Sequence, residues 1–274
     1  MDDVSPKTAA APMIHTEHLT KRFGELVAAE DVTLSIAPGE IFGLIGANGA
    51  GKSTLVKMLT TLLPPSSGTA SVAGFDVVRQ AGEVRRHIGY VPQLLSADGD
   101  LTGRENMLLS ARLYATPRGE RRQRIDSALS EMGLTEAADR LVKHYSGGMI
   151  RRLEIAQAML HEPAVLFMDE PTVGLDPLAR DAVWEHVRML QRSFHMTMLV
   201  TTHYLEEADL LCDRIAIMRR GRVVAMGTPA ELKATIGPGA TLDDVLTRVT
   251  GESGEQEGDY GDVRRERRSA LSHG

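Results

Sequence analysis

A glycine-rich stretch at residues 46–54, Gly-Ala-Asn-Gly-Ala-Gly-Lys-Ser-Thr, has the spacing of a phosphate-binding loop. Glycines let backbone N–H groups approach phosphate oxygens, and the N-terminus of the helix that follows adds positive charge. We expect Lys52 to reach the β- and γ-phosphates and the Ser53 hydroxyl to bind Mg²⁺. The loop residues predicted to bind the nucleotide are Gly46, Asn48, Gly49, Gly51, Lys52, Ser53 and Thr54.

An acidic pair follows the continuous apolar run at residues 164–168, which is typical of a central parallel strand. Open α/β sheets bind ligands at the carboxyl ends of such strands. We therefore expect Asp169 to hold Mg²⁺, directly or through water, and Glu170 to orient and deprotonate an attacking water. His203 follows a second apolar run, residues 196–202, and is expected beside the pair at the γ-phosphate. The alternatives are a solvated strand end and a purely structural histidine.

Two weaker signals point to the same ligand. Ser146 is a plausible N-cap for a helix that runs to about Leu160, and Gly147 and Gly148 fall in its first turn, where glycine is unfavourable. That cost indicates that a phosphate approaches the backbone there, although a plain capped helix start is an equal alternative. Phe23, in an early loop, is suited to stack on an adenine, although an isolated phenylalanine more often lies in the core.

The segments around these residues predict an α/β protein. Residues 41–45 read as a buried strand and residues 52–62 as a helix, so that strand, loop and helix agree and a chance lysine in a glycine-rich turn is disfavoured. Residues 97–142 are mostly helical in pattern and would form a helical insert. Further strands are expected at residues 13–19, 28–36, 69–75, 88–93, 196–202, 214–218 and 223–226, and further helices at residues 178–194, 228–237 and 241–249.

Composition limits the class of protein. The 274 residues are 42% hydrophobic and 25% charged, as in ordinary soluble globular proteins, and the net charge of −6 argues against a nucleic-acid partner. Cys212 is the single cysteine, which excludes an internal disulfide and fits a buried helix position in a reducing compartment. No apolar run approaches about 18 residues, and the N-terminus does not resemble a signal peptide. We therefore expect a cytosolic protein.

Taken in order, these motifs resemble an ATP-binding cassette (ABC) ATPase over about residues 13–237. The resemblance implies a P-loop NTPase (RecA-like) ABC nucleotide-binding domain with an antiparallel β subdomain and a helical subdomain at about residues 95–161. A C-terminal helix would follow at residues 238–251, and residues 1–12 and 252–274 are expected to be disordered. The matching motifs are the phosphate loop at Gly46–Thr54, the Q-loop at Gln93, the signature at Ser146-Gly147-Gly148, the Walker B strand at Val165–Asp169, the catalytic Glu170, the D-loop at Gly174-Leu175-Asp176 and the switch His203.

The resemblance also implies roles that spacing does not give. Two cassettes would dimerise head to tail around two ATP molecules, so that the signature of one subunit contacts the γ-phosphate bound by Lys52 of the other. Gln93 would sense Mg²⁺ and water and couple to a membrane partner, and Asp176 would link the two sites. Phe23 would stack the adenine. The implied catalytic residues are Lys52, Glu170 and His203, and the implied metal-binding residues are Ser53, Gln93 and Asp169.

The signature departs from the usual Leu-Ser-Gly-Gly-Gln, because Tyr145 and Met149 stand at its two ends. Methionine lacks the hydrogen bonds of an amide, which puts any role of the final glutamine in doubt. The form Tyr-Ser-Gly-Gly-Met, with residues 151–156 and 201–208, is similar to the daunorubicin-resistance branch, whose members export drugs or other amphiphiles. The chain would then be the ATP-hydrolysing subunit of an exporter, a homodimer at the cytoplasmic face of the cell membrane that drives a separate multi-span permease.

Two other functions compete with export. One is a soluble ABC ATPase that is not engaged in transport; ribosome-acting relatives carry two cassettes and DNA-repair relatives a long coiled-coil insert, and neither feature occurs in this sequence. The other is an ATP-binding switch without useful hydrolysis, which the presence of both Glu170 and His203 argues against. The expected ligands in the favoured reading are ATP and Mg²⁺, with no nucleic acid.

Overall fold

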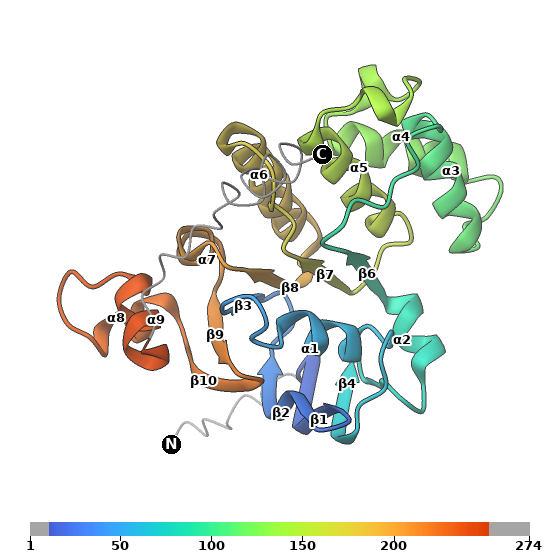
Figure 1. Cartoon of the computed structure of the whole chain (residues 1–274). Helices are drawn as coiled ribbons and strands as arrows, with labels where there is room; N and C mark the ends of the chain where they lie inside the picture. The colour runs from blue at the N-terminus through green and yellow to red at the C-terminus, as the bar shows by residue number, and fades with distance from the viewer. Residues whose placement is uncertain (1–10, 252–274) are drawn as a thin grey trace, which may run out of the picture.

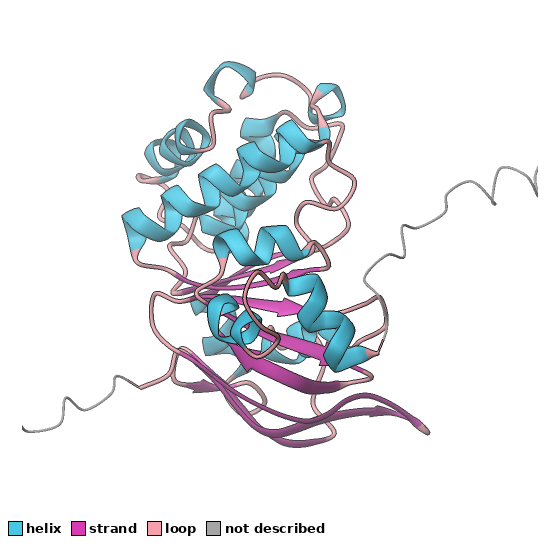
Figure 2. Ribbon diagram, turned by 90° about the vertical axis from the view of Figure 1, so that its left-hand side faces the viewer, coloured by secondary structure: helices cyan, strands magenta, loops and turns pink. Residues whose placement is uncertain are grey.

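The computed structural model describes residues 11–251, which form two β-sheets and a set of helices that cover them (Figures 1 and 2). The disorder predicted for residues 1–12 and 252–274 lies outside the described residues except at residues 11 and 12, which belong to no helix or strand. The strands are β1 (Ile14–Phe23), β2 (Leu26–Ile36), β3 (Ile41–Ile45), β4 (Ser67–Val72), β5 (Phe75–Asp76), β6 (Ile88–Val91), β7 (Val165–Asp169), β8 (Thr197–Thr202), β9 (Arg214–Arg219) and β10 (Arg222–Gly227). The helices are α1 (Lys52–Leu59), α2 (Ala81–His87), α3 (Gly103–Leu113), α4 (Arg121–Glu131), η1 (Thr135–Ala137), η2 (Val142–His144), α5 (Gly147–Met159), α6 (Pro177–Phe194), α7 (Leu205–Leu211), α8 (Pro229–Ala234) and α9 (Leu242–Thr250).

The larger sheet has the strand order β10-β9-β3-β8-β7-β6, and its strands are parallel except for the edge strand β10. Every residue of β3 and β7 is buried, which explains why both read as continuous apolar runs. Pairing places Ile45 opposite Thr202 and Asp169 opposite Thr201. The carboxyl ends of β3, β7 and β8 therefore meet at one edge of the sheet.

Two hydrophobic cores lie on opposite faces of the larger sheet. Alternate residues of β3 face each core: Ile41 and Ile45 pack with helices α5 and α6, whereas Phe42 and Leu44 pack toward α1 and the smaller sheet. That smaller, antiparallel sheet has the order β2-β1-β4-β5 (Figure 2). Helix α1 packs into the same core as Phe42 and Leu44, with Leu55 among its buried side chains. The phosphate loop is thus fixed between a central strand and a helix that is buried between the two sheets.

Helices α3, α4 and α5 gather on one side of the larger sheet (Figure 1) and fall within the residues expected for a helical subdomain. The N-terminus of α3 carries the capping box of Thr102 and Glu105. At the other end of the chain, α9 packs on α7 and α8. Among the described residues, no helix is both long enough and apolar enough to cross a lipid bilayer.

Three local predictions were wrong in detail. The helix expected over residues 52–62 ends at Leu59, because Thr61 adopts a left-handed backbone (φ 63°) and leaves Leu62 59% exposed. Phe23 ends strand β1 at a hairpin and does not lie in a loop between strands. Cys212 is buried as expected, but it follows α7 in an extended conformation and is not part of a helix.

Candidate functional site

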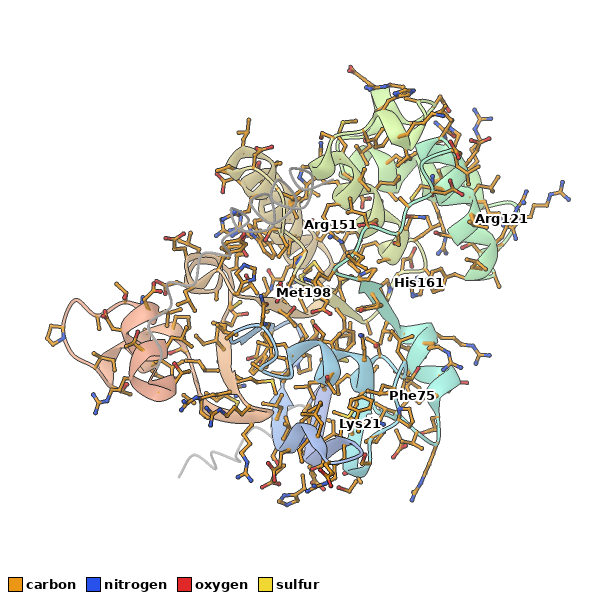
Figure 3. All side chains as sticks on the ribbon, in the orientation of Figure 1. Lys21, Phe75, Arg121, Arg151, His161 and Met198 are labelled. Atoms are coloured by element: carbon orange, nitrogen blue, oxygen red, sulfur yellow. The ribbon has the colours of Figure 1, made fainter. Side chains whose placement is uncertain are left out.

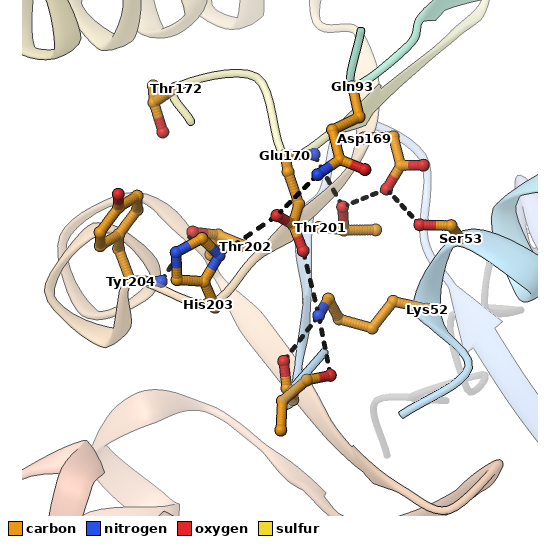
Figure 4. Close-up of polar contacts among 12 residues, drawn as sticks. Lys52, Ser53, Gln93, Asp169, Glu170, Thr172, Thr201, Thr202, His203 and Tyr204 are labelled. Carbon is orange, nitrogen blue, oxygen red and sulfur yellow. Dashed lines mark hydrogen bonds and ion pairs between the residues drawn. The ribbon is translucent and has the colours of Figure 1, made fainter. Parts of the chain in front are cut away.

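Lys52 and Glu170 form a buried ion pair at the edge where β3 and β7 end (Figure 4). Lys52 Nζ lies 3.1 Å from Glu170 Oε1, and the two side chains are 4% and 6% exposed. The same ammonium group donates to the carbonyl oxygens of Gly46 at 2.6 Å and Ala47 at 3.3 Å. The Lys52 ammonium group is therefore held by oxygen atoms of the phosphate loop and of Glu170.

The second carboxylate oxygen of Glu170 faces two other predicted residues. Its Oε2 atom lies 3.2 Å from Nδ1 of His203 and 3.5 Å from Nε2 of Gln93. The hydrogen bond with His203 and the charge of Lys52 hold the pKa of Glu170 below its usual value, against the opposing effect of burial. The structure thus brings Lys52, Gln93 and His203 around one ionised carboxylate.

The backbone of Glu170 is held in a left-handed conformation, with φ 47°. Thr201 of the neighbouring strand β8 fixes it, because the Glu170 N–H donates to both the carbonyl oxygen and the hydroxyl oxygen of Thr201. The Thr201 hydroxyl in turn donates to Asp169 Oδ1 at 2.6 Å. Thr201 was not predicted as a site residue, although a hydroxyl residue at the end of an apolar strand was a visible signal.

Ser53 and Asp169 also meet at this edge. The Ser53 hydroxyl donates to Asp169 Oδ1 at 3.1 Å, so two of the three predicted metal-binding residues share one small region (Figure 4). Hydroxyl and carboxylate oxygens are the hard donors that Mg²⁺ prefers, and Mg²⁺ commonly takes its remaining ligands from phosphates and water. The donor set of these two residues therefore fits Mg²⁺. Gln93 reaches the same cluster through Glu170.

A hollow of about 560 Å³ opens beside this cluster, a size suited to a small-molecule ligand. Phe23, which is 49% exposed, lies on its wall and is not a core residue. The predicted site residues that line the hollow are Phe23, Asn48, Gly49, Gly51, Lys52, Ser53, Thr54, Gln93 and Glu170. Arg220, from the turn between β9 and β10, also lines it and was not predicted.

The signature residues Ser146, Gly147 and Gly148 do not line this hollow. Ser146 caps helix α5 as predicted, because its hydroxyl accepts a hydrogen bond from the N–H of Met149. Packing gives a further reason for glycine in this turn, beside the predicted approach of a phosphate. A Cβ atom at Gly148 would lie 2.9 Å from the Cβ of Ala179, so packing against α6 also favours glycine at this position.

Packing also accounts for the unusual ends of the signature. The Tyr145 side chain is buried, and its hydroxyl donates to the carbonyl oxygen of Ala137 at 2.6 Å. Met149 is partly buried against the core on the side of the helices. Asp176, predicted to act across a dimer, caps helix α6 within its own chain by accepting from the N–H of Ala179 at 2.9 Å.

Arg151 is a third site residue that was not predicted, and it lies on the signature helix where α5 meets the sheet (Figure 3). Its side chain is fully buried and pairs with Glu154 at 2.9 Å. The guanidinium donates to the carbonyl oxygens of Pro92 at 2.7 Å and Gln93 at 2.8 Å. Arg151 therefore ties the helix that begins at the signature to the backbone of Gln93.

The sequence of this chain is similar to sequences of known proteins. Residues 29–173 match the family model described as "ABC transporter". The daunorubicin/doxorubicin resistance ATP-binding protein DrrA of Streptomyces peucetius is 44% identical over 87% of this chain and 73% of its own length. The aligned region therefore extends well beyond the motifs that line the hollow.

Two solved structures share the fold. The ATP-binding subunit of an ABC transporter aligns with a TM-score of 0.77 and 33% identity, over 87% of this chain and 99% of its own. The cassette MJ0796, solved as a dimer in a post-hydrolysis state bound to ADP and Pi, aligns with a TM-score of 0.71 and 28% identity, over 79% of this chain and 98% of its own. These matches confirm the predicted fold class.

Proposed function

Because the chain belongs to the ABC transporter family of ATP-hydrolysing proteins, we propose that it is the ATPase subunit of an exporter for a drug or another amphiphilic compound. The observation that carries the catalytic part is the buried carboxylate of Glu170 between Lys52 and His203, beside a hollow of nucleotide size. The relative DrrA, whose name refers to daunorubicin and doxorubicin resistance, supports the choice of cargo class.

ATP binding would begin with an exchange of partners at Lys52. In the present arrangement the ammonium group is held by Glu170 and by the carbonyl oxygens of Gly46 and Ala47. The γ-phosphate carries more negative charge than a carboxylate and would take Lys52 from Glu170. The phosphate loop glycines and the N-terminus of α1 would hold the rest of the phosphate chain.

The same exchange would make Glu170 a stronger base. Its lowered pKa depends on His203 and Lys52, and a carboxylate with a low pKa accepts a proton poorly. When Lys52 leaves and phosphate charges approach, the pKa of Glu170 rises, since like charges favour the protonated form. Glu170 would then take a proton from the attacking water, while His203 would contact the γ-phosphate and Gln93 would help to position the water.

Ser53 and Asp169 are the residues that would hold Mg²⁺, because their oxygens meet at the end of β7. When bound, Mg²⁺ would supply neutralisation of phosphate charge. Thr201 keeps Asp169 in place through its hydroxyl. Phe23, which also lines the hollow, would stack on the adenine.

We further propose that the chain works as a homodimer. The signature residues Ser146, Gly147 and Gly148 do not line the chain's own hollow, so contact with a γ-phosphate would require a second copy. The relative MJ0796 was solved as a dimer bound to ADP and Pi, which supports this arrangement. Asp176 would then stand near the junction of the two sites.

The permease surface that we propose follows Gln93 and continues on helix α3. Leu94 and Leu95, directly after Gln93, are 81% and 50% exposed. On α3, Leu109 and Leu113 are four residues apart, so they share one face, and they are 47% and 76% exposed. A polytopic membrane subunit that covers these leucines would hold the chain at the cytoplasmic face of the membrane.

The test is to tag the chain in its native host, solubilise membranes gently and identify what co-purifies. A polytopic membrane protein in near-equal amount is expected, and Leu113→Asp should release it while ATP binding persists. Leu210→Asp is the matched control, because Leu210 on α7 is 75% exposed outside the proposed surface. Recovery with a soluble partner only would overturn the exporter proposal and favour a cassette that does not act in transport.

A further inference from the structure

The turn between β9 and β10 presents an arginine where the backbone geometry favours another residue. Arg219 pairs with Arg222 across the hairpin, which leaves Arg220 and Gly221 as a two-residue loop. Both have positive φ, 47° and 81°, as in a type I′ turn. Asparagine followed by glycine is the preferred sequence of that turn. Arginine at the first position is therefore held in a conformation that its side chain does not favour.

This turn is bonded to the phosphate loop. The Gly221 N–H donates to the carbonyl oxygen of Ala50 at 2.9 Å, and its carbonyl oxygen accepts from the N–H of Glu30 on β2 at 2.8 Å. A Cβ atom at Gly51 would lie 2.4 Å from the Ala28 oxygen and 3.3 Å from Gly221 Cα, which shows how closely the three segments approach. The position of Arg220 is thus set by the phosphate loop.

Arg220 lines the same hollow as Gly49 and Lys52. Within residues 11–251, its guanidinium has no hydrogen bond or ion pair. Its neighbour Arg222 differs, because it pairs with Glu30 at 2.9 Å and does not line the hollow. An arginine without a partner, fixed at the rim of a phosphate-binding loop, has the planar donor geometry that phosphate oxygens accept.

We propose that Arg220 binds the phosphate chain of the incoming nucleotide as a second cation beside Lys52. The proposal rests on the proposed function, since it requires a nucleoside polyphosphate in the hollow. Lys52 is buried and held by Glu170, whereas Arg220 is exposed and free within the described part of the chain. Arg220 therefore meets the nucleotide first and raises the association rate, and this effect weakens with salt.

The variant Arg220→Asn separates this role from a structural one. It removes the guanidinium and installs the asparagine–glycine sequence that the turn prefers, so the melting temperature without nucleotide should stay equal or rise. ATP affinity should fall about tenfold, the size expected for one charge-assisted hydrogen bond at a partly exposed site. Arg220→Lys should lose less, because it keeps the charge. Arg222→Gln is the matched control and should bind ATP as the wild type does.

The measurement is equilibrium and stopped-flow titration with ATP, ADP and adenosine at low and moderate salt. We expect losses for ATP and ADP, none for adenosine, and a smaller salt dependence of the association rate in Arg220→Asn. Equal losses for all three ligands would mean a contact with the base or ribose and would overturn the proposal, as would wild-type affinity for ATP. A wild-type protein that binds no ATP would instead overturn the proposed function itself.

Discussion

Replacing Glu170 by glutamine should have two opposed effects, because its carboxylate holds Lys52 before ATP does. Lys52 Nζ and Glu170 Oε1 are 3.1 Å apart, and both side chains are almost fully buried. A γ-phosphate has to take Lys52 from this carboxylate, which also repels the phosphate directly. Glutamine keeps the shape and loses the charge. We therefore expect Glu170→Gln to bind ATP more tightly and to hydrolyse it far more slowly.

The distance between the charges of Lys52 and Glu170 sets the size of the expected effect on ATP binding. At an effective dielectric constant of about 20, unit charges 3.1 Å apart attract by about 5 kcal/mol. Hydration of the separated charges returns most of that energy and leaves a net of about 1–2 kcal/mol, or roughly a tenfold lower Kd for ATP in the variant. Loss of a positioned general base lowers kcat by about 10²–10⁴.

The same carboxylate predicts a pH dependence of stability. The hydrogen bond with His203 and the charge of Lys52 hold the pKa of Glu170 below its usual value of 4.5. A lowered carboxyl pKa stabilises the fold above that usual value, and the contribution is lost as the pH falls through the lowered pKa. The difference in melting temperature between the wild type and Glu170→Gln, both without nucleotide, should therefore shrink below pH 4.5.

Nucleotide titration and phosphate release measure the two effects separately. The control Glu170→Asp keeps the charge but shortens the reach by one methylene, so it should hydrolyse slowly without binding ATP more tightly. Near-normal turnover by Glu170→Gln would remove Glu170 from the role of base. Unchanged or weaker ATP binding by that variant would refute the exchange of Lys52 between carboxylate and phosphate.

Two further predictions concern packing away from Lys52, Glu170 and His203. Gly148→Ala should lower the free energy of unfolding by about 1 kcal/mol, because overpacking against Ala179, whose Cβ would lie 2.9 Å away, exceeds the gain in helix propensity. In urea denaturation, the double variant Gly148→Ala with Ala179→Gly should be more stable than the sum of the two single-variant changes in unfolding free energy predicts. Changes that simply add would contradict the contact between these two residues. Burial raises the pKa of the Cys212 thiol to about 12, so a thiol reagent should label it only after unfolding. Rapid labelling of the native protein would show that this segment opens.

Local patterns predicted the strands and the edge where the site forms. The runs at residues 41–45 and 165–168 are apolar throughout because β3 and β7 are covered on both faces. Once such strands are parallel, the residues that follow them meet at one edge. The order of motifs along the chain therefore predicted that Lys52, Glu170 and His203 would lie together, and they do.

The predictions failed where a distant contact decides the local structure. Leu62 continues the helical spacing of α1, yet the left-handed Thr61 ends the helix before it. Glycine at Gly148 reflects the approach of Ala179 from another helix, which no local pattern reveals. Arg220 enters the hollow from a hairpin far along the chain, where its arginine-rich turn reads as ordinary solvated surface. Each of these features depends on contacts between segments far apart in the sequence, which the spacing of residue types does not reveal.

The contacts of the signature helix argue that the two sites of the proposed dimer are coupled. Gly148 packs directly on Ala179 of α6, and Arg151 on the same helix α5 holds the backbone of Gln93. The Gln93 side chain in turn reaches the carboxylate of Glu170 at 3.5 Å. A phosphate that draws the signature toward a partner subunit would therefore move Gln93 relative to this chain's own Glu170. Nucleotide bound across the interface would thus adjust the hydrolytic site of the chain whose signature it contacts.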